Sequence, residues 1–307
     1  MAKVKGKVND GKSGDKKNVR NKRESSKYIN PLTDFGFKHI FGAKASMLDF
    51  LNAVLNIEGA IAYLTYDNTE KIAHADEDRT ARYDLHCTTG TGERVIIEMQ
   101  NQSQYFFRDR MLYYATFPIQ EQAPKGKDWD FKLNPVYSVN ITNFRMNRTE
   151  TINTEKKYCS YFQLMNTDTK EIFSDKLIFV VLELPLFDKT EDELQTGMDK
   201  WMFVLKNLPK LNDLPAGFRN EVFEQLFHTA EIAKLSASDR KEYYRSLKSY
   251  RDMNNYITQR DRKIAEQRNI IIGYQQREVE HQQQVATKDK IIAELRQQLS
   301  LKDSQTN

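Results

Sequence analysis

Residues 82–100 read RYDLHCTTGTGERVIIEMQ, and they carry the clearest secondary-structure pattern in the chain. Polar and apolar residues alternate over 82–87, and residues 94–100 form a second strand-like run around Val95-Ile96-Ile97. The two runs flank the Thr-Gly-Thr-Gly segment at 89–92. Alternation with a period of two is typical of strands, and glycine-containing segments between two such runs form tight turns. The stretch therefore predicts an antiparallel β-hairpin.

The predicted hairpin sets two carboxylates opposite each other. If the strands pair symmetrically about the turn, residues whose numbers sum to 182 face each other, so Asp84 falls opposite Glu98. Side chains two residues apart share a face, which puts Gln100 beside Glu98. The hairpin is thus expected to be polar on one face, with Val95 and Ile97 buried on the other.

This carboxylate pair predicts a bound cation. Like charges at paired positions destabilise a sheet unless something compensates them. A hard divalent ion, Mg²⁺ or Mn²⁺, suits carboxylate oxygens that are completed by a backbone carbonyl and water. Such an ion activates water and stabilises charge on phosphorus, so phosphodiester hydrolysis is the expected chemistry. A glycosidase is disfavoured, because paired strands hold two acids closer than the roughly 5–5.5 Å that such enzymes use.

Further elements are expected on either side of the hairpin. Apolar residues at helical spacing predict helices within about 33–55, where Gly42 separates two of them, and over about 103–122. Runs rich in β-branched and aromatic residues at 135–141 and 177–184 predict two more strands, the second buried on both faces. The expected fold class is α/β, a small mixed sheet with helices packed on it.

The same residues resemble a known family. Asp84, a hairpin and then Glu98-Met99-Gln100 look like the PD-(D/E)XK signature, in the variant with Gln in place of Lys and with Tyr83 where the signature has Pro. Segments 33–42, 48–52, 98–101 and 108–114 resemble the Rpn-like family of recombination-promoting nucleases and transposases. The resemblance spans residues 28–186 and implies a restriction-endonuclease-like core with metal-dependent DNA endonuclease activity.

Site roles are implied by this resemblance, position by position. Asp84 and Glu98 would hold the metal ion, with the Met99 carbonyl as a further ligand. Gln100 would orient the attacking water or a phosphate oxygen, and because its amide is uncharged, the ion must provide more of the catalysis. Asp34, at the expected start of the first helix, is the candidate extra catalytic acid, and an N-cap role explains it equally well.

Other residues near these motifs have two interpretations. Lys38, Arg108 and Arg110 suit contact with phosphate, but solvated side chains or surface salt bridges explain each of them singly. Tyr113 and Tyr114 are expected in the core rather than as platforms for bases, because the helix that carries them needs an apolar face.

The two ends of the chain differ from its middle. Residues 1–27 hold ten Lys or Arg and three Asp or Glu, a net charge of ten minus three, or +7. We expect a basic disordered tail there, and both DNA contact and a solubilising role stay open. A helical region is expected over 187–250. Over 251–307, an apolar residue at nearly every seventh position predicts a long helix. It is either a weak coiled coil, through which the chain would form a homo-oligomer, or a solvated helix frayed at Gly273.

Composition narrows the class of protein. A chain of 307 residues with 39% hydrophobic residues can bury a sizeable core. Its two cysteines cannot build a disulfide framework, and a reducing compartment is favoured. We expect a cytoplasmic protein with DNA as partner and no membrane, since no apolar run approaches the roughly 20 residues of a span. The alternative function is a nuclease-fold protein that binds DNA or protein without cleaving.

Overall fold

The computed structural model describes residues 26–55, 57–68, 70–71, 81–82, 84–123, 129–146 and 157–305. The chain divides into two compact units, of which the first holds residues 36–236 and those up to 31, and the second holds 32–35 and 237–307. Residues 1–25 of the predicted basic tail lie outside the described residues, as does Tyr83.

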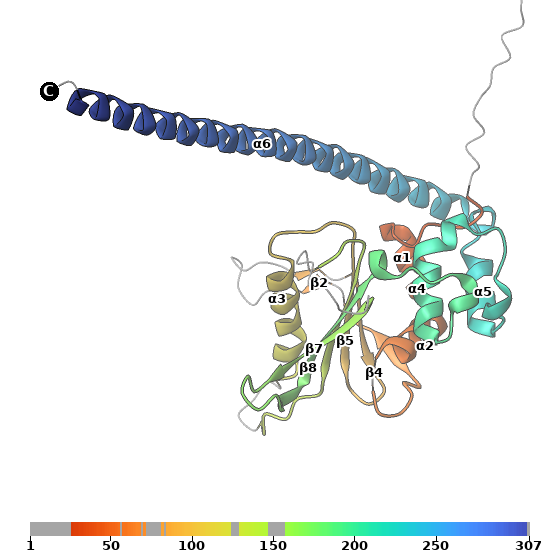
Figure 1. Ribbon diagram of the computed structural model, residues 1–307. Coiled ribbons are helices and arrows are strands. Elements are labelled where there is room, and N and C mark those ends of the chain that lie inside the picture. The colour runs from red at the N-terminus through yellow and green to blue at the C-terminus, as the bar shows by residue number, and fades with distance from the viewer. Residues whose placement is uncertain are drawn as a thin grey trace, which may run out of the picture. The chain divides into compact units, whose positions relative to one another are not determined.

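A six-stranded mixed sheet lies at the centre of the first unit (Figure 1). β5, β6 and β8 run parallel to one another, and the remaining pairs are antiparallel. In spatial order the strands are β1 (Leu64–Tyr66), β4 (Leu85–Thr89), β5 (Arg94–Gln100), β6 (Val136–Thr142), β8 (Ile172–Glu183) and β7 (Cys159–Met165). A separate two-stranded ladder pairs β2 (Glu70–Lys71) with β3 (Ala81–Arg82).

The hairpin of β4 and β5 has the predicted register. Leu85 pairs with Ile97 and Thr88 pairs with Arg94, so the paired residue numbers sum to 182. Gly92 closes the turn with a φ of +100°, a conformation that glycine adopts without a steric penalty. The ladder begins at Leu85, so Asp84 lies directly before its first pair.

Both faces of this hairpin are covered, which corrects the expectation of one buried face. Val95 and Ile97 are buried as predicted, but Ile96 on the opposite face is equally inaccessible. Ile96 packs in one cluster with Ala115 of α3 (Phe107–Gln120) and with Val136 of β6. The connection from β5 through α3 to the parallel strand β6 explains this, because such a crossover lays its helix on the sheet.

Helices also lie on the other side of the sheet from α3 (Figure 1). The Tyr66 hydroxyl of edge strand β1 donates to the Phe41 carbonyl, and the Tyr161 hydroxyl of the opposite edge strand β7 donates to the Val54 carbonyl at 2.7 Å. The helices of this layer therefore reach both edges. They are α1 (Asp34–Phe41), α2 (Lys44–Val54), α4 (Gly197–Asn207) and α5 (Glu221–Thr229).

An aromatic cluster holds this helical layer together. Phe41, Phe50 and Trp201 are buried, with ring centroids 4.8 to 5.6 Å apart. The predicted break between the first two helices is confirmed at Gly42, where a Cβ atom would lie 2.5 Å from the Lys38 carbonyl oxygen. Glycine permits the close turn that brings α1 and α2 into this cluster.

The second unit is dominated by α6 (Ala237–Gln305), an uninterrupted helix of 69 residues. Its first turns pack on residues 32–35, where the Phe35 N–H donates to the Ser246 hydroxyl at 3.1 Å and the Phe35 ring contacts Tyr243. The helix runs through Gly273 without a break. Pairing of α6 as a coiled coil, and the predicted domain limits at 186 and 250, stay predictions. None of the described helices is long and apolar enough to cross a membrane.

Candidate active site

Asp84 and Glu98 meet where β4 begins and β5 ends. The Asp84 N–H donates to Glu98 Oε1 at 3.3 Å, and the Met99 N–H donates to Asp84 Oδ2 at 2.7 Å. These two bonds continue the hairpin ladder by one step with side-chain oxygens as acceptors. The prediction that the two carboxylates lie together is confirmed, since Asp84 directly precedes β4 and bonds to Glu98 of the paired strand β5.

The electrostatics of this corner disfavour a second negative charge. Glu98 is buried, and burial raises its pKa to about 8, with the neighbouring charge of Asp84 acting in the same direction. The charges of Arg110 and Lys38 and the Asp84 N–H oppose this rise without cancelling it. A buried carboxylate that is costly to ionise beside a second acid is the environment that a bound cation relieves.

Backbone geometry adds the Met99 carbonyl to the possible ligands. Alternate residues of a strand turn their peptide groups toward opposite neighbours. The Gln100 carbonyl faces β6, where it accepts from the Asn143 N–H at 2.9 Å, so the Met99 N–H and carbonyl both face the Asp84 side. Within the described residues, no three or more His, Cys, Asp or Glu side chains gather to hold a metal.

Two carboxylates and one carbonyl are hard oxygen donors, and they fit Mg²⁺ or Mn²⁺ if water or a substrate phosphate completes the coordination. The fit rests on the number and kind of donors at this corner. It also rests on the raised pKa of Glu98, which a cation would lower.

Gln100 is held by its amide from two sides. Its Nε2 donates to the Gln102 carbonyl at 3.0 Å, and its Oε1 accepts from the Arg110 guanidinium. These contacts fix which end of the amide points toward α3. Gln100 lies two residues after Glu98 and shares its face of the sheet.

Arg110 lies beside Gln100, a contact that the sequence did not predict. Its guanidinium also donates to Gln104 Oε1 at 2.8 Å and lies over the rings of Phe107 and Tyr114, at 5.6 and 5.7 Å from their centroids. Helical spacing of three and four residues from these aromatic side chains was the available signal that Arg110 lies on the sheet-facing side. Arg108 is exposed.

Comparison with known protein families identifies the family of this chain. A family model described as PD-(D/E)XK nuclease family transposase matches residues 31–260, well over half of the chain. The chain belongs to this family. No curated protein and no solved structure matches it. The resemblance stated from the sequence is thus confirmed, and so is the α/β fold of a mixed sheet flanked by helices.

Lys38 and Asp34 belong to segment 33–42, which carries part of the family resemblance, and their surroundings in the structure differ. Lys38 lies close enough to Glu98 for its charge to lower the pKa of that carboxyl. Asp34 is exposed and belongs to the second compact unit, so its catalytic role stays a prediction. Asp49, within the matched range, is structural, because it accepts from the Trp201 indole N–H at 2.7 Å.

The prediction that Tyr113 and Tyr114 are core residues is wrong for the first. Tyr113 is 43% exposed, whereas Tyr114 is half-buried and packs against the cluster around Ala115. Burial and the charge of Glu98 raise the pKa of Tyr114. The buried face of α3 is therefore narrower than the number of its aromatic residues suggests, and the Tyr113 ring lies outside it.

Two polar residues of β6 were missed from the sequence. Asn140 pairs with Glu98 and Thr142 pairs with Gln100, and paired residues project from the same face. Asn140 is buried, and its amide donates to the Ser138 hydroxyl at 2.9 Å. Only the parallel pairing of β5 with β6 brings these residues to the site, and no local pattern specifies that register.

Proposed function

We propose that this PD-(D/E)XK family protein is a DNA endonuclease that hydrolyses phosphodiester bonds with Mg²⁺ or Mn²⁺. The observation that carries the proposal is the meeting of Asp84 and Glu98, in which the Asp84 carboxylate accepts from the Met99 N–H at 2.7 Å and the pKa of Glu98 is raised to about 8. The two carboxylates lie where the family's motif lies, and the nearby charges of Arg110 and Lys38 leave the pKa of Glu98 raised.

Each residue then has a distinct task. Asp84, Glu98 and the Met99 carbonyl would hold the divalent ion, which when bound activates water and stabilises charge on phosphorus. Gln100 would orient the attacking water or a phosphate oxygen through an amide fixed by Arg110. Arg110 supplies a permanent positive charge next to the position where the commoner motif has Lys, so part of that charge is provided from α3.

The partners follow from the same proposal. DNA is the substrate, and residues 1–27 would add sequence-independent contacts with phosphate. The exposed apolar residues of α6, among them Ile264 and Ile271, would support a homo-oligomer. The alternative function is a protein of this fold that binds DNA or protein without cleaving it.

The test is a cleavage assay on plasmid and synthetic DNA with Mg²⁺, Mn²⁺, Ca²⁺ or EDTA. The wild type and the variants Asp84→Ala, Glu98→Ala and Asp175→Ala are compared, where Asp175 is an exposed acid that pairs with Lys176 on the surface. Cleavage that needs the ion and both site acids, and that survives Asp175→Ala, supports the proposal. Binding without cleavage under every condition assigns the alternative function instead.

A further inference from the structure

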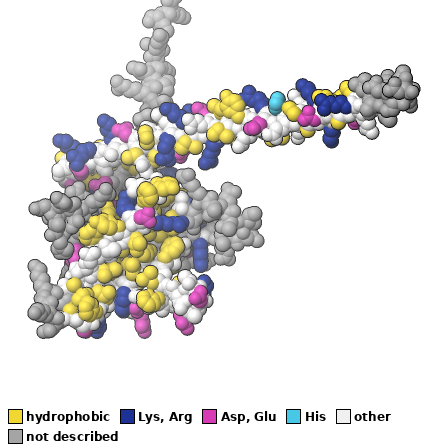
Figure 2. Space-filling view, turned by 90° about the vertical axis from the view of Figure 1, so that its left-hand side faces the viewer, with side chains coloured by type: hydrophobic (Ala, Val, Ile, Leu, Met, Phe, Trp, Pro, Cys, Tyr) yellow, Lys and Arg dark blue, Asp and Glu magenta, His cyan; other side chains and the backbone are white. Residues whose placement is uncertain are grey.

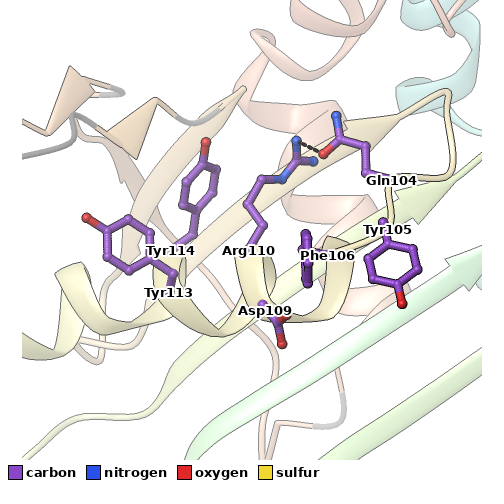
Figure 3. A pocket seen from close by; sticks show the side chains of 7 residues that line it. All are labelled: Gln104, Tyr105, Phe106, Asp109, Arg110, Tyr113 and Tyr114. Carbon is purple, nitrogen blue, oxygen red and sulfur yellow. Dashed lines mark hydrogen bonds between the residues drawn. The ribbon is translucent and has the colours of Figure 1, made fainter.

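An open pocket of about 540 Å³ lies beside the active site, in the first half of α3 and the loop before it (Figure 3). Its volume falls within the roughly 300–1,000 Å³ of small-molecule sites. Four lining residues are aromatic, namely Tyr105, Phe106, Tyr113 and Tyr114. Rings from two consecutive stretches of chain thus line one hollow, with Arg110 drawn between Phe106 and Tyr114.

These rings are unusually open to solvent. Tyr105 is 95% exposed and Phe106 is 67% exposed, although their rings contact each other edge to face at a centroid distance of 4.8 Å. The space-filling view from the side of α3 shows hydrophobic side chains gathered in patches on this face (Figure 2). Clustered exposed aromatic groups cost solubility and mark a surface that binds something.

Two residues join this pocket to the catalytic corner. Arg110 lines the pocket, donates to Gln100 and lowers the pKa of Glu98 by its charge. Tyr114 lines the pocket as well, and the charges of Glu98 and Asp84 both act to raise its pKa. The pocket is therefore linked to the candidate active site through Arg110, which lines the one and hydrogen-bonds Gln100 of the other.

The two charged lining residues, Asp109 and Arg110, have opposite signs, so the pocket has no net charge that would favour an anion over a neutral ring. Asp109 places a carboxylate in the pocket, which repels phosphate but accepts hydrogen bonds from the amino groups of bases. Gln104 uses its Oε1 to accept from Arg110, so its amide N–H₂ faces other partners. Aromatic rings, a carboxylate and an amide suit a nucleobase, with the faces of the rings for stacking and the polar groups for its edge.

We infer that this pocket stacks one unpaired nucleobase of the strand being cut, so that the substrate is single-stranded or locally unpaired DNA. A base inside a duplex is already stacked on both faces and cannot lie against a protein ring without leaving the helix. The inference rests on the proposed nuclease function, because it takes the base to belong to a nucleotide next to the phosphate at Asp84 and Glu98.

Binding by the full chain in EDTA tests the pocket without cleavage. A labelled single strand and its matching duplex are titrated with the wild type, with the double variant Tyr105→Ala/Phe106→Ala and with Phe173→Ala. Phe173 is 82% exposed in β8 and serves as the matched control. The double variant should bind the single strand about tenfold more weakly, the effect of one lost stacking contact, and bind the duplex as the wild type does. Phe173→Ala should change neither.

A second measurement locates the base. One abasic nucleotide is moved along a single-stranded substrate, and cleavage by the wild type is followed with Mn²⁺. Cleavage should fall about tenfold at one fixed offset from the cut, and the double variant should lose that dependence. Because both substituted side chains are exposed, circular dichroism and melting temperature should match the wild type.

The outcomes separate this inference from the proposed function. If the wild type cuts DNA but the double variant keeps wild-type single-strand binding, the pocket inference is overturned and the nuclease proposal stands. If no DNA is cut with any ion but the double variant alone loses single-strand binding, the pocket stands and the nuclease proposal fails. If the double variant binds single-stranded DNA as the wild type does, the pocket inference is overturned whether or not the protein cleaves DNA. The same holds if the pocket is found to bind a peptide instead of a base.

Discussion

Two buried acids of the first unit show opposite ways of holding a negative charge. Asp199 of α4 is inaccessible, yet its pKa is lowered, because Lys189 at 2.7 Å, the Tyr158 hydroxyl at 2.5 Å and the backbone N–H of Thr196 at 3.0 Å compensate its charge despite burial. Glu98 is almost as buried, but its pKa is raised to about 8. The contacts of Asp199 outweigh the cost of burying its charge, whereas the Asp84 N–H and the charges of Arg110 and Lys38 do not do so for Glu98.

Removal of either acid of the candidate site should have the largest effect on activity. Asp84→Ala or Glu98→Ala should reduce cleavage by about 10³-fold or more, since ion-mediated stabilisation worth several kcal/mol is lost. The melting temperature in metal-free buffer should stay the same or rise slightly, because carboxylate repulsion is relieved. Both are measured with and without Mn²⁺. A wild type that neither cleaves nor gains stability from the ion, and matches the Asp84 variant, contradicts the metal site.

Asp199 should respond in the opposite way. Asp199→Ala removes the acceptor that Lys189 and the Tyr158 hydroxyl share. We therefore expect a loss of about 3 kcal/mol in the free energy of unfolding. Denaturant titration measures this, and adding Mn²⁺ should not restore it. Because the folded pKa of Asp199 is below its ordinary value of 3.8, the stabilisation is present above that pH and lost as the pH falls further. A loss that Mn²⁺ reverses would make Asp199 part of an ion site.

Glu98 and Asp199 should also differ in how they make stability depend on pH. Glu98 has an ordinary pKa of 4.5 and a folded pKa of about 8, so its contribution to stability is fully present below pH 4.5 and is lost as the pH rises toward 8. Glu98→Gln should therefore gain stability relative to the wild type across that window in EDTA, by at most about 1.4 kcal/mol per pH unit. If the difference in unfolding free energy between Glu98→Gln and the wild type is the same at every pH, ionisation of Glu98 does not cost stability. Saturating Mn²⁺ should stabilise only the wild type.

The sequence allowed the hairpin to be predicted because its information is local. Alternation and a short glycine-containing turn fix the pairing of residue numbers, and thereby the meeting of Asp84 with Glu98. β1 and β7 were not predicted. β7 has its exposed residues in succession rather than in alternation, and β1 is only three residues long. Such edge strands are defined by their neighbours and carry little pattern of their own.

The rest of the site depends on contacts between distant segments. Asn140 reaches Glu98 only through the parallel register of β5 and β6. Arg110 was predicted to be helical, but its place beside Gln100 depends on how far α3 extends over the end of β5. Tyr113 was assigned to the core from its aromatic character, while the packing of α3 buries Met111 and Ala115 instead. Residue type alone does not specify which side of a short amphipathic helix meets the sheet.

The smallest expected effect concerns Arg110, which we place as a positioning residue acting through Gln100. Gln100→Ala and Arg110→Ala should each lower kcat about tenfold with little change in KM. The kcat of the double variant should be no lower than that of the less active single variant, because the effects of substituting two residues in contact do not add. Gln100→Lys supplies its own positive charge and should retain activity, so Arg110→Ala should cost less in that background. Lys176→Ala, which removes an exposed surface cation, is the matched control. If the losses from Gln100→Ala and Arg110→Ala multiply in the double variant, the two residues act independently, and the charge of Arg110 serves the substrate directly instead of through the amide.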